Sequence, residues 1–206
     1  MHVHPVLFGP ICEDKEKVEF RKQAFGLYKS SPIPMSQVMA VMDHAGVDKA
    51  VLLAEDYSAE MGRPIISNEE VKMLVDLEPE RFIGFAGVDP RNCDAREQLE
   101  QAFSELKLSG LKLNLSHLQM YPDDKRLEPL LKLCVQYEKP VMFHSGFSWE
   151  PDSPSKYGRP ILYEDIAMEY PSLRFCLAHL GWPWVDELCM MLLKYPNVYT
   201  DTATVF

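Results

Sequence analysis

The sequence predicts a parallel α/β fold of the (β/α)-barrel type, and three observations support this prediction. Short, nearly continuous apolar runs alternate with segments of helical periodicity. The runs start about 25 to 35 residues apart, which is the length of one strand–helix unit. Because the runs are apolar throughout, they are typical of strands buried on both faces, as in parallel sheets. A doubly wound open sheet is the second choice, since no Gly-x-Gly-x-x-Gly or P-loop pattern occurs.

The predicted strands are rich in Val, Leu and Phe, and a further short strand is expected at the N-terminus. The runs cover residues 49–54, 82–88, 110–115, 140–144, 174–179 and 197–202.

The segments between the strands have helical patterns with recognisable ends. Gly46 is a good residue to end the first helix, Ser67 and Glu70 form a capping-box pattern, and Pro196 stops the last helix. Residues 9–34 are polar and charged, and we expect an insertion at the rim of a single domain spanning 1–206. The predicted helices cover residues 35–45, 67–77, 95–108, 125–138, 163–170 and 184–195.

Composition excludes several classes of partner. A net charge of -10 argues against nucleic acid and anionic membranes, because phosphate binding needs clustered Lys and Arg. The sequence contains no uninterrupted run of 18 apolar residues, so it does not predict a membrane-spanning helix. The five cysteines lack C-x-x-C spacing, so reduced thiols and a cytoplasmic location are expected. A small molecule is the expected partner.

Four histidines stand where predicted strands end, namely His2, His4, His144 and His179. Side chains alternate between the faces of a strand, so His2 and His4 project to the same side, about 7 Å apart along the backbone. Joined by imidazoles from parallel strands, they predict a site for a divalent metal ion, with Zn²⁺ preferred and Mn²⁺ or Fe²⁺ possible. The alternatives are a mobile terminus for His2 and His4 and backbone hydrogen bonding for the other two.

With these strands placed, the chain resembles the amidohydrolase superfamily. The resemblance is to its branch of metal-dependent TIM-barrel hydrolases, which includes aminocarboxymuconate-semialdehyde decarboxylase. Matching motifs run in the family's order along nearly the whole chain. They are His-x-His at residues 1–5, Gly-Leu-Lys-Leu at 109–113, Phe-His-Ser-Gly at 140–146, Ala-His-Leu-Gly at 177–181 and Val-Tyr-Thr-Asp at 197–201.

The resemblance implies roles for particular residues. His2, His4 and His144 resemble the family's metal ligands, and His179 resembles a histidine that assists catalysis or binds a second metal. The family's Asp after strand eight has no counterpart here, so we expect an incomplete (β/α)8 TIM barrel that lacks strand eight and most of strand one. Three imidazoles alone can still hold Zn²⁺.

Further residues are weaker candidates for substrate binding. Lys112 is either carboxylated to bridge two metals, as in some family members, or a cation for an anionic substrate. His117 follows strand four and either contacts substrate or lies in an ordinary loop. Trp149 and Trp182 place aromatic surface near the barrel mouth, for a planar substrate or for loop packing. Asp201 matches strand seven and is expected to support other residues or the fold.

Three functions fit these residues. The first is a metal-dependent hydrolase acting on a small amide, ester or lactone through a metal-activated water. The second is a lyase, a decarboxylase or hydratase acting on a small unsaturated or aromatic carboxylate. The third is an inactive barrel fragment. Whichever function holds, exposed strand edges would favour association of the chain into a homo-oligomer.

Overall fold

The computed structural model describes residues 1–203, and these form one sheet of seven parallel strands. The strands follow one another in the order β1 to β7, each paired with the next strand of the chain. Their bounds are β1 His2–Val3, β2 Ala50–Leu53, β3 Phe82–Gly87, β4 Leu111–Leu113, β5 Val141–Phe143, β6 Phe175–Leu177 and β7 Val198–Thr200.

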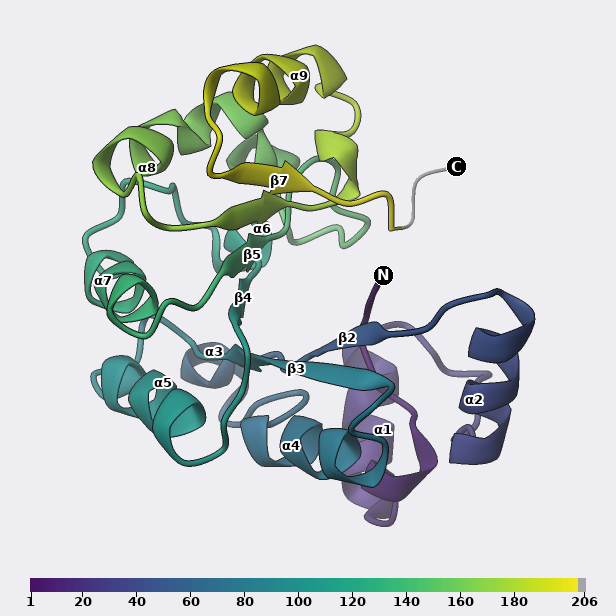
Figure 1. Ribbon diagram of the computed structural model, residues 1–206. Helices are drawn as coiled ribbons and strands as arrows, with labels where there is room; N and C mark the ends of the chain where they lie inside the picture. The colour runs from purple at the N-terminus through teal and green to yellow at the C-terminus, as the bar shows by residue number, and fades with distance from the viewer. Residues whose placement is uncertain (204–206) are drawn as a thin grey trace.

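The sheet curls so that its first and last strands face each other across an opening (Figure 1). Within residues 1–203 no backbone pairing joins β7 to β1. Sequential order and parallel pairing throughout are the topology of an incomplete (β/α)8 barrel, as the sequence predicts.

The connections between the strands are helical, and the longer helices lie outside the curled sheet (Figure 1). Among the described residues, no helix combines the length and the apolar character needed to cross a membrane. The α-helices are α1 Lys15–Ala24, α2 Met35–His44, α3 Ser58–Met61, α4 Asn68–Leu77, α5 Ala95–Ser104, α6 Leu115–Leu118, α7 Glu128–Gln136, α8 Glu164–Glu169 and α9 Val185–Lys194. The 3-10 helices are η1 Gly9–Ile11, η2 Ser155–Gly158, η3 Pro160–Tyr163 and η4 His179–Gly181.

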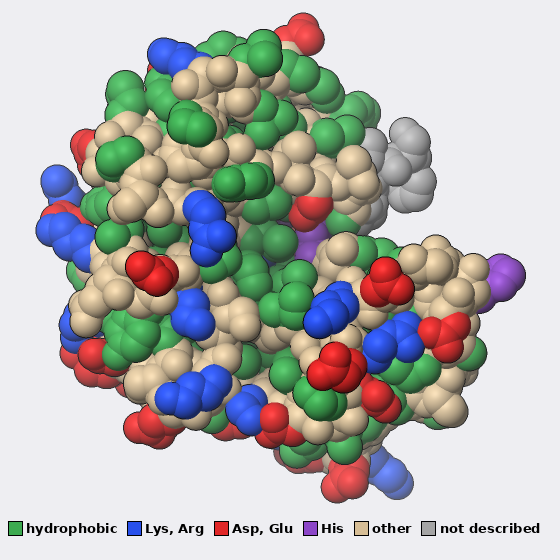
Figure 2. Space-filling model, viewed as in Figure 1, with side chains coloured by type: hydrophobic (Ala, Val, Ile, Leu, Met, Phe, Trp, Pro, Cys, Tyr) green, Lys and Arg blue, Asp and Glu red, His purple; other side chains and the backbone are tan. Residues whose placement is uncertain are grey.

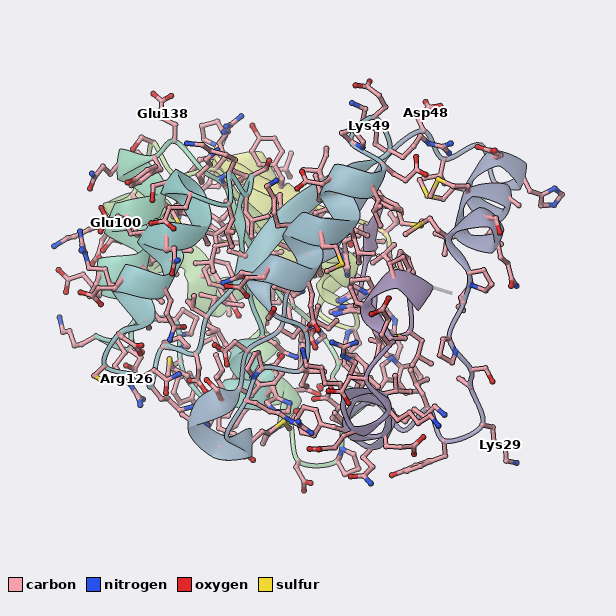
Figure 3. The ribbon with its side chains drawn as sticks, turned by 90° about the horizontal axis from the view of Figure 1, so that it is seen from below. Lys29, Asp48, Lys49, Glu100, Arg126 and Glu138 are labelled. Atoms are coloured by element: carbon pink, nitrogen blue, oxygen red, sulfur yellow. The ribbon has the colours of Figure 1, made fainter. Side chains whose placement is uncertain are left out.

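Two apolar cores lie on the two faces of the sheet. The larger core packs the helices against the outer face and includes Leu111, Val141 and Phe175. The smaller core fills the inner face with Leu53, Phe85, Met142 and Ala178. Charged side chains on the connecting segments, such as Lys49, Arg126 and Glu138, point outward (Figure 3). The inner face is therefore mainly apolar, with the buried Lys112 of β4 as a charged exception.

Several element ends differ from the sequence-based prediction. Residues 110–115 were expected to be one strand, but β4 ends at Leu113, because the Asn114 side chain accepts a hydrogen bond from the His117 amide and starts α6. Residues 174–179 likewise stop being a strand at Leu177. His179 lies in η4 with a φ of 61°, a left-handed conformation that ends regular pairing.

The capping box at Ser67 and Glu70 is confirmed at the start of α4. Residues 9–34, to which the sequence assigned no element, contain η1 and α1. All five cysteines are free thiols.

A buried arginine ties α1 to the rest of the fold. Arg21 is 1% exposed, and its guanidinium donates to the carbonyls of Ile65 and Ile11 and contacts the Glu70 carboxylate at 2.6 Å. Glu70 in turn also accepts from Lys17 at the surface. Because a guanidinium can serve several acceptors in a fixed fork, one side chain holds three separate chain segments.

Replacing this guanidinium should destabilise the protein strongly. Arg21→Met leaves two backbone carbonyls without their side-chain donor and removes the guanidinium from the partly buried Glu70 carboxylate, which keeps only Lys17 and the Ser67 amide. We expect a loss of about 3 kcal/mol in the free energy of unfolding, measured by urea denaturation. Arg96→Met is the matched control, since Arg96 forms only an exposed pair with Glu100 and should cost less than about 0.5 kcal/mol. Equal losses in the two variants would contradict this account.

Asp89 is a second buried charge, just beyond the end of β3. Its side chain is fully buried and accepts hydrogen bonds from the guanidinium and amide of Arg91 and from the Ala59 amide. Burial by itself raises the pKa of Asp89, but the hydrogen bonds and charge of Arg91 outweigh it, so the net pKa lies below the ordinary 3.8.

This lowered pKa makes part of the stability depend on pH. Below about pH 4 the unfolded chain protonates Asp89 while the folded chain does not, so the contribution of this carboxylate is complete above its ordinary pKa and declines as the solution becomes more acidic. The stability advantage of the wild type over Asp89→Asn should therefore shrink between about pH 6 and about pH 3 in urea titrations. A constant difference across this range would show that Asp89 acts only as a neutral acceptor.

Candidate functional site

Four imidazoles from three parts of the chain meet where the strands end. The ring centroids of His2 and His4 are 5.7 Å apart, those of His2 and His179 are 5.0 Å apart, and those of His144 and His179 are also 5.0 Å apart. The carboxyl ends of parallel strands share one edge of a sheet, which brings these distant residues together. A histidine surface is visible at the floor of the hollow between the two halves of the molecule (Figure 2).

Three of these rings have an oxygen atom beside Nδ1. His2 Nδ1 lies 2.7 Å from Asp201 Oδ2, and His179 Nδ1 donates to the Ala203 carbonyl at 2.7 Å. His4 Nδ1 lies 2.7 Å from Glu55 Oε1, although without hydrogen-bond alignment. A ring that donates through Nδ1 keeps its lone pair on Nε2, which is the arrangement that second partners impose on metal-binding histidines.

The fourth ring, His144, has an unsatisfied nitrogen, as His4 does. Its Nε2 is buried and has no hydrogen-bond partner in the described part of the chain. Burial lowers the pKa of His144 well below its ordinary value, and it lowers the pKa of His2 to about 4. Burial also lowers the pKa of His179, although its bond to the Ala203 carbonyl opposes the change. These rings are therefore neutral near pH 7, the state in which imidazole binds a metal ion.

The donor set fits a divalent cation in chemistry and in spacing. With metal–nitrogen distances of about 2.0–2.1 Å and tetrahedral angles, two ligating rings have centroids about 5 Å apart, close to the separations measured here. Among residues 1–203, however, no three His, Cys, Asp or Glu side chains already surround a single point. An ion at this position would require the rings to rotate, and it would give the buried His144 Nε2 the partner that the described residues do not supply.

Lys112 lies next to the histidines on the inner face of the sheet. It is only 4% exposed, and its Nζ has no hydrogen-bond partner within residues 1–203. Burial lowers its pKa, while the charges of Glu55 and Asp201 oppose that change. Lys112 lines a small cavity together with Glu55, Tyr57 and Asn114.

His117 belongs to a separate polar cluster on α6. Its ring stacks on Tyr57 with centroids 3.7 Å apart, and its Nδ1 lies 2.9 Å from Glu150 Oε2. Ser153 donates to the same carboxylate at 2.6 Å. Because Tyr57 also lines the cavity beside Lys112, His117 supports one wall of that cavity.

Trp149 and Trp182 are not brought against the imidazoles. Both are largely exposed, at 71% and 52%, and the ring contacts they make are with Phe147. Phe147 follows His144 by three residues and Trp182 follows His179 by three, so this aromatic group borders the site from two loops.

Two acidic residues of the site were missed in the sequence. Glu55 is buried beside His4, and its signal was its place directly after the predicted strand 49–54, at the same edge as the histidines. Glu150 reaches His117 from a long loop, and no sequence signal pointed to it. Asp201, expected to support other residues, contacts His2 and also accepts hydrogen bonds from the amides of His179 and Ala203.

The whole chain, residues 1–206, matches a family model described as Amidohydrolase, and the chain therefore belongs to the amidohydrolase family. Among curated proteins, protein fluG of Emericella nidulans is 31% identical over 72 residues, which are 35% of this chain and 8% of that protein.

Solved structures share the barrel fold. An uncharacterized TIM-barrel protein, Bb4693 of Bordetella bronchiseptica, superposes with a TM-score of 0.69 and 23% identity over 81% of this chain and 58% of that chain. The 4-oxalomesaconate hydratase LigJ of Rhodopseudomonas palustris has a TM-score of 0.64 and 20% identity over 100% of this chain and 74% of that chain. The 5-carboxyvanillate decarboxylase of Novosphingobium aromaticivorans, complexed with manganese and a nitrobenzoic acid, has a TM-score of 0.56 and 20% identity, covering 87% and 64% of the two chains. The chain thus spans a small part of the fungal relative and little more than half of the Bordetella protein.

The Asp201 carboxylate should determine how well the site holds a metal ion. Asp201→Asn removes the charge that orients the His2 ring, and we expect divalent-ion affinity, measured by competition with a chromogenic chelator, to fall about 10- to 100-fold. Asp186→Asn removes a carboxylate from the first turn of α9 and should leave this affinity unchanged. Equal affinity for the wild type and Asp201→Asn would show that the contact with His2 plays no part in binding.

Proposed function

We propose that this chain forms the active site of a metal-dependent lyase that decarboxylates or hydrates a small carboxylate. The observation that carries the proposal is the convergence of His2, His4, His144 and His179, with Nδ1 of three rings beside an oxygen atom. His2, His4 and His144 would hold a divalent ion, with Zn²⁺ first and Mn²⁺ as the main alternative.

A bound divalent ion would supply a Lewis acid that polarises a substrate oxygen. The proton transfers would depend on side chains of the protein. His179 is half-buried, and its Nδ1 donates a hydrogen bond to the Ala203 carbonyl. Its Nε2 is then the basic atom, suited to accept a proton from the substrate or a water molecule and to return it. Asp201 stabilises this arrangement, because it accepts from the His179 amide and holds His2.

Lyase chemistry is preferred to hydrolysis on two grounds. Most of the compared structures whose names state an activity are decarboxylases or a hydratase, and one is named an amidohydrolase. The site also contains the buried ammonium of Lys112, which has no hydrogen-bond partner within residues 1–203 and suits a carboxylate better than a neutral amide. Hydrolysis of an amide, ester or lactone is the second candidate, favoured by the family's description. An inactive fragment is the third.

Metal analysis of the purified protein tests the proposal first. We expect close to one equivalent of a divalent ion in the wild type and a loss of most of it in His144→Ala, because this variant removes the buried unpartnered nitrogen. His44→Ala is the control, since His44 ends α2 and lies on the surface. Release of CO₂ from aromatic carboxylates would then distinguish decarboxylation from hydrolysis of the corresponding amides.

Two results would contradict the proposal. One is metal-free wild-type protein that takes up no ion on titration, which favours the inactive fragment. The other is unchanged metal content in His144→Ala, which places any ion elsewhere.

A further inference from the structure

Lys112 is a charged group that the fold leaves unsatisfied. The residue lies in the middle of β4, between Leu111 and Leu113, which belong to the outer core. Alternation along the strand therefore directs Lys112 to the inner face, where its neighbours across the sheet are Met142 and Gly87. At 4% exposure it has little access to water, and nothing in the described residues accepts a hydrogen bond from Nζ. An ammonium in this state is costly, and such groups are normally paired.

The two carboxylates nearest to this charge already have other partners. Glu55 lies 2.7 Å from the His4 ring, and Asp201 lies 2.7 Å from the His2 ring. Asp201 also accepts hydrogen bonds from two backbone amides. Both act on Lys112 through their charge at longer range, but neither makes a short contact with it. The protein thus supplies an acidic partner to each of these histidines and none to the lysine.

The surroundings of Lys112 form a small cavity with a flat wall. Tyr57, Val88 and Leu118 contribute apolar surface, and Asn114 contributes an amide. The Tyr57 ring is 5% exposed and is held in place by stacking on His117, which is anchored in turn by Glu150. Tyr57 and Lys112 therefore line the same small cavity, and the position of Tyr57 is held by its contact with His117.

A divalent ion on the histidines would increase the need for a negative group. Glu55 and Asp201 together balance such an ion, and Lys112 then leaves a surplus of one positive charge in the buried site. A single carboxylate neutralises this surplus and has two oxygen atoms, one available to each cation.

We propose that Lys112 is the residue that binds the carboxylate of the substrate, an inference that rests on the proposed function. The unpaired ammonium would become satisfied only when substrate binds, so part of the binding energy would come from relieving a buried charge. A neutral analogue of the same shape would lack this gain.

Calorimetric titration with benzoate and with its neutral analogue benzamide tests the proposal. The samples are the metal-loaded wild type, Lys112→Met and Lys125→Met, where Lys125 is an exposed lysine and serves as the matched control. We expect the wild type to prefer benzoate, and Lys112→Met to bind benzoate about tenfold or more weakly, as loss of a charged hydrogen bond requires. Benzamide binding should change less than about twofold in either variant. The same titrations on chelator-treated wild type should retain a preference for benzoate, because Lys112 remains when the metal is gone.

The outcomes separate this inference from the proposed function. A wild type that takes up no metal ion on titration but still prefers benzoate supports Lys112 and contradicts the metal-dependent lyase. Unchanged benzoate affinity in Lys112→Met overturns the inference while leaving the metal site intact. Incorporation of isotope-labelled bicarbonate into Lys112 as a carbamate, detected by NMR, overturns it as well. If Lys112→Met does not fold, the comparison of benzoate and benzamide on chelator-treated wild type decides the question, and equal affinities reject the proposal.

Discussion

The contact between His2 and Asp201 is the constraint on which the geometry of the site depends. It joins residues 199 positions apart, and it bridges the first strand and the segment after the last one, which share no backbone pairing in the described structure. Asp201 simultaneously accepts from the His179 amide. One carboxylate therefore fixes two of the four imidazoles relative to each other, across the opening of the sheet (Figure 1).

Burial gives this arrangement its chemical character. Removing the imidazoles from water favours their neutral form, so that their nitrogen lone pairs are available to a cation instead of to protons. The same burial makes the Lys112 ammonium costly when unpaired. Under the proposed function, the site would take two ligands of opposite charge, a divalent cation on the imidazoles and an anion at Lys112. Neither would be as well accommodated alone.

The fold could be predicted from the sequence because continuous apolar runs at regular spacing are the direct consequence of strands buried on both faces. The convergence of His2, His4, His144 and His179 followed from one rule, that parallel strands end at a common edge. The same rule places Glu55, which follows β2, at this edge. A single acidic residue outside any motif was, however, not enough to predict that Glu55 belongs to the site. The ends of the strands depended on local events that periodicity does not encode, namely capping by Asn114 and the left-handed backbone at His179. The pairing of His117 with Glu150 and the stacking on Tyr57 depend on loop paths that only the folded chain defines.

The most direct measurement of the central claim is anomalous diffraction from crystals of this protein grown with Zn²⁺. This account predicts one strong peak among the imidazoles, about 2.0–2.1 Å from Nε2 of His144 and of at least two of His2, His4 and His179. A map in which the zinc lies elsewhere, or in which Nε2 of His144 stays without a ligand, would contradict it.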